Sequence, residues 1–336
     1  MNAQLRQTMR APRLGFLGLG WIGCQRMQVL ADSGIATVAA IADPHPDAQA
    51  RAAQYAPDAR RCADLAALLD DDLDGIVIAT PSAAHAPQAI AAFERGLSVF
   101  CQKPLARTAA EAAKVLEAAR RADRLLGVDF SYRAMAGVPA LRDCIQAGEL
   151  GTIYAVDLAF HNAYGPDKPW FYDIAQSGGG CVMDLGTHLV DMAQWICASA
   201  GHDGLVADLY AQGERLRAPF ERVEDYAAAQ WRMDNGANVR MACSWRLAAG
   251  CDAVIDVAFH GTRGGAAIRN VDGSFYDFTV ERFDGTACTT LAAPPDAWGG
   301  RALVAWAGRL RDGAGFDPDA MQWLQVARTV DAIYGR

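Results

Sequence analysis

Two residues near the middle of the chain have the types and spacing of an acid–base pair. Asp184 and His188 lie four positions apart in a segment predicted to be helical from 180 to about 197. Residues four apart share a helix face, so the two side chains are expected to point the same way. A carboxylate beside an imidazole fixes its tautomer and raises its basicity, which suits a general acid–base. The alternative is an ordinary surface pair, but the three preceding glycines at 178–180 cost entropy unless backbone must approach closely.

A second constellation lies near the N-terminus. Gly18, Gly20 and Gly23 follow an apolar run at 14–17 in the spacing G-x-G-x-x-G, and the residues from Trp21 onward predict a helix. Such a strand-to-helix turn lets backbone N–H groups approach a pyrophosphate. A second apolar run at 38–42 ends in Asp43, 20 residues after Gly23, where a carboxylate can accept hydrogen bonds from the ribose of NAD. The alternative is a plain glycine turn followed by an aspartate that caps a helix.

Composition excludes several classes of partner. The chain has 336 residues, of which 52% are hydrophobic, and a formal net charge of −8. The length predicts two domains, and the negative charge argues against a nucleic-acid partner. Residues 1–12 lack the apolar centre of a signal peptide, and no run of about eighteen apolar residues follows, so we expect a disordered 1–12, no membrane partner and a cytoplasmic protein. Nine cysteines without a C-x-x-C motif indicate reduced, buried residues, and nothing indicates a metal site.

The first half of the chain alternates predicted strands and helices. Strands are expected at 14–17, 38–42, 75–79, 97–101 and 125–128, and helices at 21–30, 46–54, 63–69, 82–93 and 108–121. This alternation predicts an α/β Rossmann domain over 13–129, a doubly wound parallel sheet whose ligand lies beyond the carboxyl ends of its strands. Those ends carry the glycine turn, Asp43, Thr80, Pro81, His85, Gln102 and Lys103. His85 fits either the cofactor edge or a helix surface.

The second half changes in character. After a helix at 140–147, strands are expected at 153–161, 206–213, 225–233, 237–247, 253–260, 265–270 and 275–282, with a final amphipathic helix at 318–334. Many strands and few helices predict an α+β domain over 130–336, with a large, mainly antiparallel, open-faced sheet. Val239, Met241 and Cys243 lie on one side of a predicted strand. We expect such an apolar face to be buried in a homodimer or homotetramer.

Taken together, the motifs resemble the Gfo/Idh/MocA family of NAD(P)-dependent oxidoreductases. The resemblance rests on G-F-L-G-L-G-W-I-G, A-T-P-S-A-A-H, C-Q-K-P-L-A and G-G-G-C-V-M-D-L-G-T-H-L-V-D-M, in order from about residue 12 to 197. It implies a Rossmann domain joined to an open-faced sheet, sugar or cyclitol substrates, and dimers or tetramers formed through the sheet. By resemblance Lys103 matches the lysine of the family's E-K-P motif, and Asp184 and His188 match its catalytic D-x-x-x-H pair. The chain departs from the family at Gln102, where Glu is usual.

These roles predict a dehydrogenase or reductase that moves a hydride between a nicotinamide and a hydroxyl or keto carbon of a sugar, sugar derivative or cyclitol. His188 is expected to be the base, oriented by Asp184, while Lys103 holds the same oxygen or relays its proton. Cofactor contacts are expected from Gly18, Gly20, Trp21, Ile22, Gly23, Asp43, Thr80, Pro81, His85, Gln102 and Lys103. Substrate contacts are expected from Lys103, Arg133, His161, Tyr164, Trp170, Asp184 and His188, in a region that also holds Tyr132, Asn162 and Lys168.

Several alternatives stay open at this point. Lys103 could be merely solvated, and the loop at 164–170 could be ordinary packing. The protein could also be a glycoside hydrolase or lyase that uses tightly bound NAD in an internal redox cycle, or a non-catalytic binding member of the family.

Two further expectations concern charge. NAD(H) is favoured over NADP(H), because Asp43 would repel a 2′-phosphate and no arginine directly follows it. With Gln102 neutral, Lys103 is expected either to lose its proton more easily and share the acid–base work, or to stay charged without a counter-ion and favour an anionic substrate such as a uronate.

Overall fold

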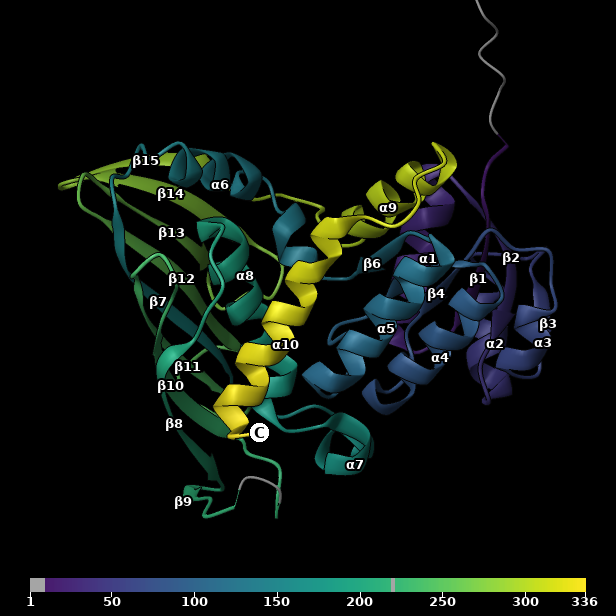
Figure 1. Ribbon diagram of the computed structural model, residues 1–336, viewed down its shortest axis with the longest axis horizontal. Coiled ribbons are helices and arrows are strands. Elements are labelled where there is room, and N and C mark those ends of the chain that lie inside the picture. Colours follow the sequence, from purple (N-terminus) through teal and green to yellow (C-terminus); the bar gives the residue numbers. More distant parts are fainter. Residues whose placement is uncertain (1–9, 219–220) are drawn as a thin grey trace, which may run out of the picture.

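Two β-sheets organise the computed structural model, which describes residues 10–218 and 221–336 (Figure 1). The first sheet has six parallel strands in the order β3-β2-β1-β4-β5-β6. Its strands are β1 (Arg13–Leu17), β2 (Thr37–Ala42), β3 (Arg60–Cys62), β4 (Gly75–Ile78), β5 (Ser98–Cys101) and β6 (Leu126–Val128). The strand order reverses between β1 and β4, which is the doubly wound Rossmann arrangement. The predicted class of the first half is confirmed.

The connecting helices follow the predicted alternation. They are α1 (Trp21–Ser33), α2 (Pro46–Ala52), α3 (Leu65–Leu69), α4 (Ser82–Glu94) and α5 (Ala109–Ala122). α1 ends at Gly34, whose φ of 64° suits a residue without a Cβ. The Thr108 side chain caps α5 by accepting a hydrogen bond from Glu111 N. β3 is not predictable from an apolar run, because two of its three residues are exposed arginines.

The N-terminal segment is only partly described. Residues 1–9 of the predicted disordered stretch 1–12 lie outside the described residues. Residues 10–12 make specific contacts, since Arg10 pairs with Asp74 at 3.0 Å and the Pro12 carbonyl accepts from Thr37 N at 2.8 Å. These contacts lead residues 10–12 into β1, where the Pro12 carbonyl continues the pairing of β1 with β2. No helix in the described ranges is long and apolar enough to cross a bilayer.

The second sheet has nine strands in the order β15-β14-β13-β12-β7-β11-β10-β8-β9. They are β7 (Ile153–Asn162), β8 (Asp203–Ala211), β9 (Glu214–Arg215), β10 (Tyr226–Arg232), β11 (Asn238–Ser244), β12 (Ala253–Gly261), β13 (Gly265–Asn270), β14 (Phe278–Asp284) and β15 (Ala287–Ala292). Only the β7–β11 pair is parallel within the described residues. The predicted mainly antiparallel sheet is confirmed. β15 was not predicted because its side chains are exposed on both faces and show no alternation.

Helices cover one face of this sheet. The helical segments of the second half are η1 (Ser131–Ala134), α6 (Val138–Gln146), η2 (Pro169–Tyr172), α7 (Ile174–Ser177), η3 (Val182–Gly186), α8 (Thr187–Cys197), α9 (Arg301–Arg311), η4 (Pro318–Ala320) and α10 (Met321–Tyr334). In Figure 1, α6, α8 and α10 lie on the side of the sheet that faces the Rossmann domain, and the opposite face carries no helix of the described chain.

The apolar side of β11 is the covered side. Val239, Met241 and Cys243 are buried, because η3 packs over β11. Arg240 points the other way and pairs with Asp157 of β7 at 2.7 Å. The expectation that these three apolar residues form an open face is therefore wrong.

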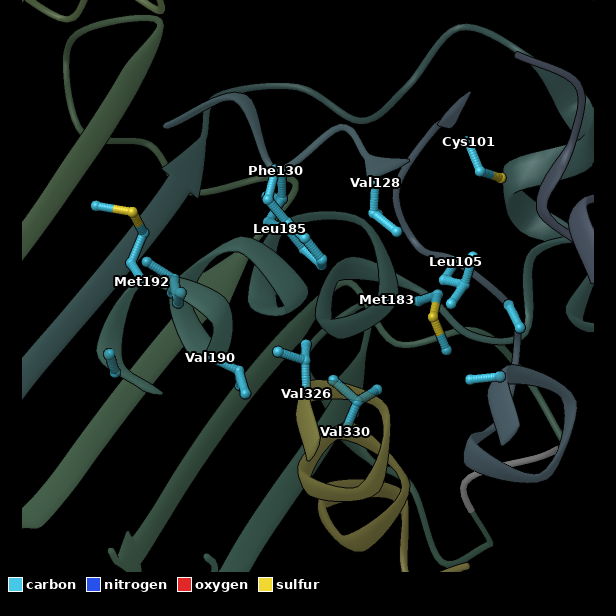
Figure 2. Packing of buried hydrophobic residues seen from close by; sticks show 14 of the residues in the cluster. Cys101, Leu105, Val128, Phe130, Met183, Leu185, Val190, Met192, Val326 and Val330 are labelled. Carbon is cyan, nitrogen blue, oxygen red and sulfur yellow. The ribbon is translucent and has the colours of Figure 1, made fainter. Parts of the chain in front are cut away.

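The core continues across the boundary between the two sheets. Met183 of η3 lies among Leu105, Val128 and Val330, which come from the Rossmann domain and from α10 (Figure 2). The segment that carries Asp184 is therefore packed against both halves of the molecule.

One late helix returns to the first domain. Leu303, Trp306 and Ala307 of α9 share a buried cluster with Phe16 and other Rossmann residues, and α9 packs against α1. The predicted second domain, 130–336, thus contains a helix that belongs by packing to the first.

Candidate active site

A large cleft lies at the carboxyl edge of the Rossmann sheet, facing η3 and the second sheet. Its volume of about 1670 Å³ exceeds the roughly 300–1,000 Å³ of a typical drug-sized pocket. Its walls include these predicted residues: Gly18, Gly20, Trp21, Ile22, Asp43, Thr80, Pro81, His85, Gln102, Lys103, Trp170, Asp184 and His188. The cleft has room for a dinucleotide and a small substrate together.

The glycine turn is built for close backbone approach. A Cβ on Gly18, whose φ is +89°, would lie 2.5 Å from Ala79 O, and one on Gly23 would lie 2.2 Å from Gly18 O. Gly23 therefore serves packing and does not line the cleft. Gly20 caps α1 with no side-chain hydrogen bond, and beyond its two neighbours in sequence Lys168 Nζ is the one described atom that would lie within 4 Å of an added Cβ there. The free N–H groups above an open Gly20 fit a pyrophosphate.

Asp43 is tied to this turn. Its Oδ2 accepts from Leu19 N at 2.8 Å and its Oδ1 accepts from His45 N at 2.9 Å. The carboxylate is 9% exposed and lies in the cleft wall. Each oxygen keeps a second lone pair, so Asp43 can hold the turn and still accept from a ribose hydroxyl.

His85 has a structural role in the loops around the cleft. Its Nδ1 lies 2.7 Å from Pro104 O and its Nε2 lies 2.8 Å from Thr80 O, and the side chain is buried. Burial lowers the pKa of His85. The ring links the loop after β4 to the Lys103–Pro104 turn. The helix-surface alternative for His85 is wrong, because the side chain is buried. His85 lines the cleft, but both of its ring nitrogens already have backbone partners, so a direct contact with the cofactor stays a prediction.

Lys103 and Asp184 form the central polar contact of the cleft. Lys103 Nζ donates to Asp184 Oδ1 at 2.8 Å and to Asp184 O at 2.9 Å. Trp245 Nε1 donates to the other carboxylate oxygen, Oδ2, at 3.0 Å. The expectation of a merely solvated lysine is wrong, and so is that of a lysine without a counter-ion, because Asp184 supplies the charge that Gln102 lacks.

Asp184 does not orient His188 in this structure. Both carboxylate oxygens are used by Lys103 and Trp245, and Asp184 makes no hydrogen bond to His188 within the described chain. The cause is the π-helical turn η3, which ends at Gly186 between the two residues. A π turn bonds i to i+5, so residues four apart no longer stack on one face.

His188 faces the cleft from a ring of aromatic side chains. Its imidazole packs edge-on against Tyr132 at 4.8 Å between centroids and lies 6.2 Å from Phe130. Burial, and after it the charges of Lys103 and Arg26, hold the pKa of His188 well below 6.5. The ring is therefore neutral at neutral pH and can accept a proton. Nδ1 is buried without a partner among the described side chains.

A buried charge network lies beneath position 102. Gln102 Nε2 donates to Asp129 Oδ2 at 2.5 Å, and Arg26 Nε donates to the same oxygen at 2.6 Å. Asp129 and Arg26 are 1% and 5% exposed. The usual carboxylate at 102 is thus absent, but a carboxylate stands within hydrogen-bond distance of that position. Asp129 follows β6 directly, so the rule that ligands meet the carboxyl ends of strands could have indicated it.

A second buried network anchors the segment that carries Asp184. Glu224 accepts from Gly180 N at 3.0 Å, from Val182 N at 2.9 Å and from Tyr334 Oη at 2.7 Å. Burial raises the pKa of Glu224. A Cβ on Gly180 would lie 1.9 Å from Glu224 O, and one on Gly179 would lie 2.0 Å from Tyr334 Oη. The glycines before Asp184 are therefore required by close approach, as predicted.

Three predicted substrate residues lie outside the cleft. Arg133 turns away to pair with Asp191, and its Nε donates at 2.8 Å. His161 lies on β7 with Nδ1 2.9 Å from Ser244 Oγ. Tyr164 is exposed and contacts Phe275 by its ring edge. None of the three lines the cleft as described, so the structure gives these assignments no support. Sequence proximity to the cleft did not indicate which way the side chains turn.

Other cleft residues come from far along the chain. Phe275, Tyr276, Asp296 and Trp298 line the substrate side, and Trp298 lies 5.1 Å from the ring of Tyr132. These residues belong to no motif, and only the folding of the second sheet brings them to the cleft.

The comparisons with known proteins agree with this architecture. The NAD-binding Rossmann domain of an oxidoreductase family matches residues 13–130, and the GFO/IDH/MocA C-terminal domain matches residues 138–267. The chain belongs to the Gfo/Idh/MocA family. The NAD-binding domain and the predicted family are thereby confirmed.

Individual members give a more detailed comparison. Levoglucosan dehydrogenase from Pseudarthrobacter phenanthrenivorans is 30% identical over 67% of this chain and 63% of its own length. Inositol 2-dehydrogenase from Salmonella paratyphi B is 34% identical over 55% of this chain and 54% of its own length. The aligned part of the chain thus spans about three fifths of the length of the levoglucosan dehydrogenase and about half of the length of the inositol 2-dehydrogenase. A solved levoglucosan dehydrogenase in complex with NADH and levoglucosan shares the fold, with a TM-score of 0.83 at 22% identity over 97% of each chain.

Proposed function

We propose that the protein is an NAD(H)-dependent dehydrogenase or reductase acting on a CH–OH group or keto carbon of an uncharged sugar, sugar derivative or cyclitol. The observation that carries the proposal is the Lys103–Asp184 pair beside a neutral His188, in the same cleft as the glycine turn. The names of the relatives, a levoglucosan dehydrogenase and an inositol 2-dehydrogenase, support the substrate class. When bound, NAD(H) supplies the hydride acceptor or donor.

The chain's own residues divide the remaining work. His188 is the proton acceptor for the substrate hydroxyl, because its depressed pKa keeps the ring neutral. Lys103 favours the negative charge that develops on the same oxygen. Asp184 keeps the ammonium of Lys103 in position, and Trp245 keeps Asp184 in position. Trp170 and Trp298 cover apolar C–H surface of the substrate.

The charges of the cleft favour an uncharged substrate. Lys103 is neutralised by Asp184, and Arg26 by Asp129. The substrate side adds aromatic rings and Asp296, whose carboxylate is paired with Arg301, so these residues leave no unpaired cation for a uronate. The anionic-substrate expectation therefore has no support in this cleft.

The cofactor choice is part of the proposal. Asp43 lines the cleft, and its charge opposes a 2′-phosphate. We expect NADH to bind more tightly than NADPH in a fluorescence titration. Asp43→Asn should bring the dissociation constants of NADH and NADPH closer together. Tighter binding of NADPH than of NADH by the unmodified protein would overturn the assignment of NAD(H) as the cofactor.

One experiment tests the activity. A panel of sugars, cyclitols and their keto forms is incubated with each cofactor, and the absorbance of reduced nicotinamide is followed. Lys103→Met and His188→Asn should each lower turnover at least about 100-fold while retaining NADH binding. His161→Asn, outside the cleft, is the control. Consumption of a glycoside without net absorbance change would favour the internal redox cycle instead.

Assembly and location complete the proposal. We propose a homodimer or homotetramer formed through the uncovered face of the nine-stranded sheet, whose centre carries Ala159, Ala242 and Ala228 on neighbouring strands. We also propose a cytoplasmic enzyme, because a reducing compartment keeps its nine free cysteines reduced.

A further inference from the structure

Lys168 lies over the glycine turn although it belongs to the other half of the chain. We propose that Lys168 is a cofactor-binding residue, which contacts the pyrophosphate of the dinucleotide from the side opposite α1. The inference rests on the proposed function in one respect, that the cleft holds NAD(H), and it adds a residue that no motif of the chain indicates.

The geometry at Gly20 carries the inference. A Cβ placed on Gly20 would lie 3.1 Å from Lys168 Nζ, and apart from the two neighbours of Gly20 in sequence no other atom of the described chain would lie within 4 Å. Gly20 is the N-cap of α1, and neither a capping side chain nor an acidic residue of the first turn occupies the N–H groups there. A group seated on the turn therefore meets backbone N–H groups on one side and an ammonium on the other.

The charge of Lys168 favours an anion at this place. Its side chain is exposed and makes no hydrogen bond or ion pair to the described part of the chain. The helix N-terminus beside it carries partial positive charge, so both would attract an anion seated between them. Asp167 also lines the cleft, but it is the nitrogen of Lys168 that lies beside Gly20. A pyrophosphate supplies the matching charge and acceptor oxygens.

The loop that presents Lys168 is held in shape by its own contacts. The Lys168 carbonyl accepts from Phe171 N at 3.2 Å, and Tyr172 Oη donates to Pro166 O at 3.0 Å. The ring of Tyr172 packs against Trp245 at 5.4 Å. Trp245 is the residue that donates to Asp184. Through this chain of contacts, a cofactor held by Lys168 also holds the loop that carries Trp170 against the substrate side.

The rarity of lysine makes the proposal easy to test. Of the 31 lysines and arginines of the chain only three are lysines, at positions 103, 114 and 168. Lys103 and Lys168 line the cleft, whereas Lys114 is exposed on α5 away from it. Lys114 is therefore an internal reference for chemical labelling and a matched control for substitution.

The first test measures binding to the full-length variants. Lys168→Gln should raise the dissociation constants of NADH and of ADP about five- to tenfold at low salt, and leave that of adenosine, which has no phosphate, unchanged. Lys168→Arg should restore most of the affinity, and Lys114→Gln should have no effect. An equal loss for adenosine, or no loss for ADP, would overturn the proposal.

The second test separates this proposal from the function itself. Acetylation of the three lysines is quantified by mass spectrometry with and without ligand. ADP should protect Lys168 while Lys114 is labelled at its usual rate. A result in which NADH binds and turns over while Lys168 is labelled equally with and without ligand would overturn the proposed contact of Lys168 with the pyrophosphate. That result would leave the proposed function intact. If NADH does not bind at all, the proposed function fails first.

Discussion

Lys103 Nζ lies 2.8 Å from Asp184 Oδ1, and the two residues come from different halves of the chain. Lys103 follows β5 of the Rossmann sheet, and Asp184 lies on the π turn that packs over the second sheet. Both side chains are largely buried, at 20% and 16% exposed. A partly buried pair of this kind keeps its strength only while both partners stay in position. The polar centre of the site therefore exists only when the two halves are docked.

The pKa of His188 predicts where activity falls with acid. Because burial and two neighbouring cations hold this pKa well below 6.5, the imidazole stays neutral through the range where a free histidine takes up a proton. The acidic limb of kcat/KM against pH should lie well below pH 6.5. A limb centred at 6.5 would mean that the ring is not desolvated as described.

The same shift predicts how stability depends on pH. The unfolded state takes up a proton on His188 as pH falls through about 6.5, while the folded state does not, so stability is lost in that direction. The variant His188→Asn lacks the titrating imidazole and therefore lacks this contribution to the pH dependence of stability. Its free energy of unfolding should therefore fall less than that of the parent between about pH 7 and 5, measured by urea titration.

Gln102 and Asp129 should behave as a coupled pair. Gln102→Glu places a second carboxylate beside Asp129 with only Arg26 to balance them, and it should destabilise the fold by about 3 kcal/mol. Asp129→Asn alone leaves Arg26 without its counter-ion. In the double variant one carboxylate again faces one guanidinium. Its loss of stability should therefore be smaller than the sum of the losses of the two single variants by at least about 1 kcal/mol. Additive losses in denaturant titrations would rule out this exchange of charge between the two positions.

Gly180 should tolerate no side chain. Its added Cβ would lie 1.9 Å from the backbone oxygen of Glu224, so Gly180→Ala should cost at least about 3 kcal/mol and abolish turnover with it. Gly308 on α9 is the control, because a Cβ there meets only Ile35 Cδ1 at 3.6 Å. Gly308→Ala should stabilise the protein by about 0.5–1 kcal/mol in thermal unfolding.

The sequence predicted the parts of the fold that repeat a local pattern. The Rossmann strands other than β3 were recognisable as apolar runs, and the glycine turn by its spacing. The site was only half predictable, because Lys103, Asp184 and His188 lie in motifs while Phe275 and Trp298 do not. The π turn escaped prediction because one extra residue in a helical turn leaves no mark on hydrophobic spacing. The turn of Arg133 toward Asp191, 58 positions later, depends on tertiary packing that no local pattern encodes.

Assembly through the open sheet face can be tested at its centre. Ala242 pairs with Ala228 and Ala159 on the uncovered side, so a carboxylate there would be buried without a partner in a sheet-to-sheet contact. Ala242→Glu should shift the mass measured by light scattering toward the monomer. Thr289→Glu on the exposed β15 should leave it unchanged. A monomeric parent protein at micromolar concentration would contradict the proposal.

The return of α9 to the Rossmann core has a mechanical consequence. The polypeptide passes between the two bodies after β6 and again before α9, and a third connection is α10, which packs against both α5 and α8. Three tethers permit a small rocking motion but resist the wide swing that a single linker allows. Opening of the cleft for exchange of a dinucleotide should therefore occur through its loops, such as the one bearing Lys168, with the two bodies nearly fixed. For the same reason, a fragment that stops at residue 130 would leave the pocket filled by Trp306 open to water.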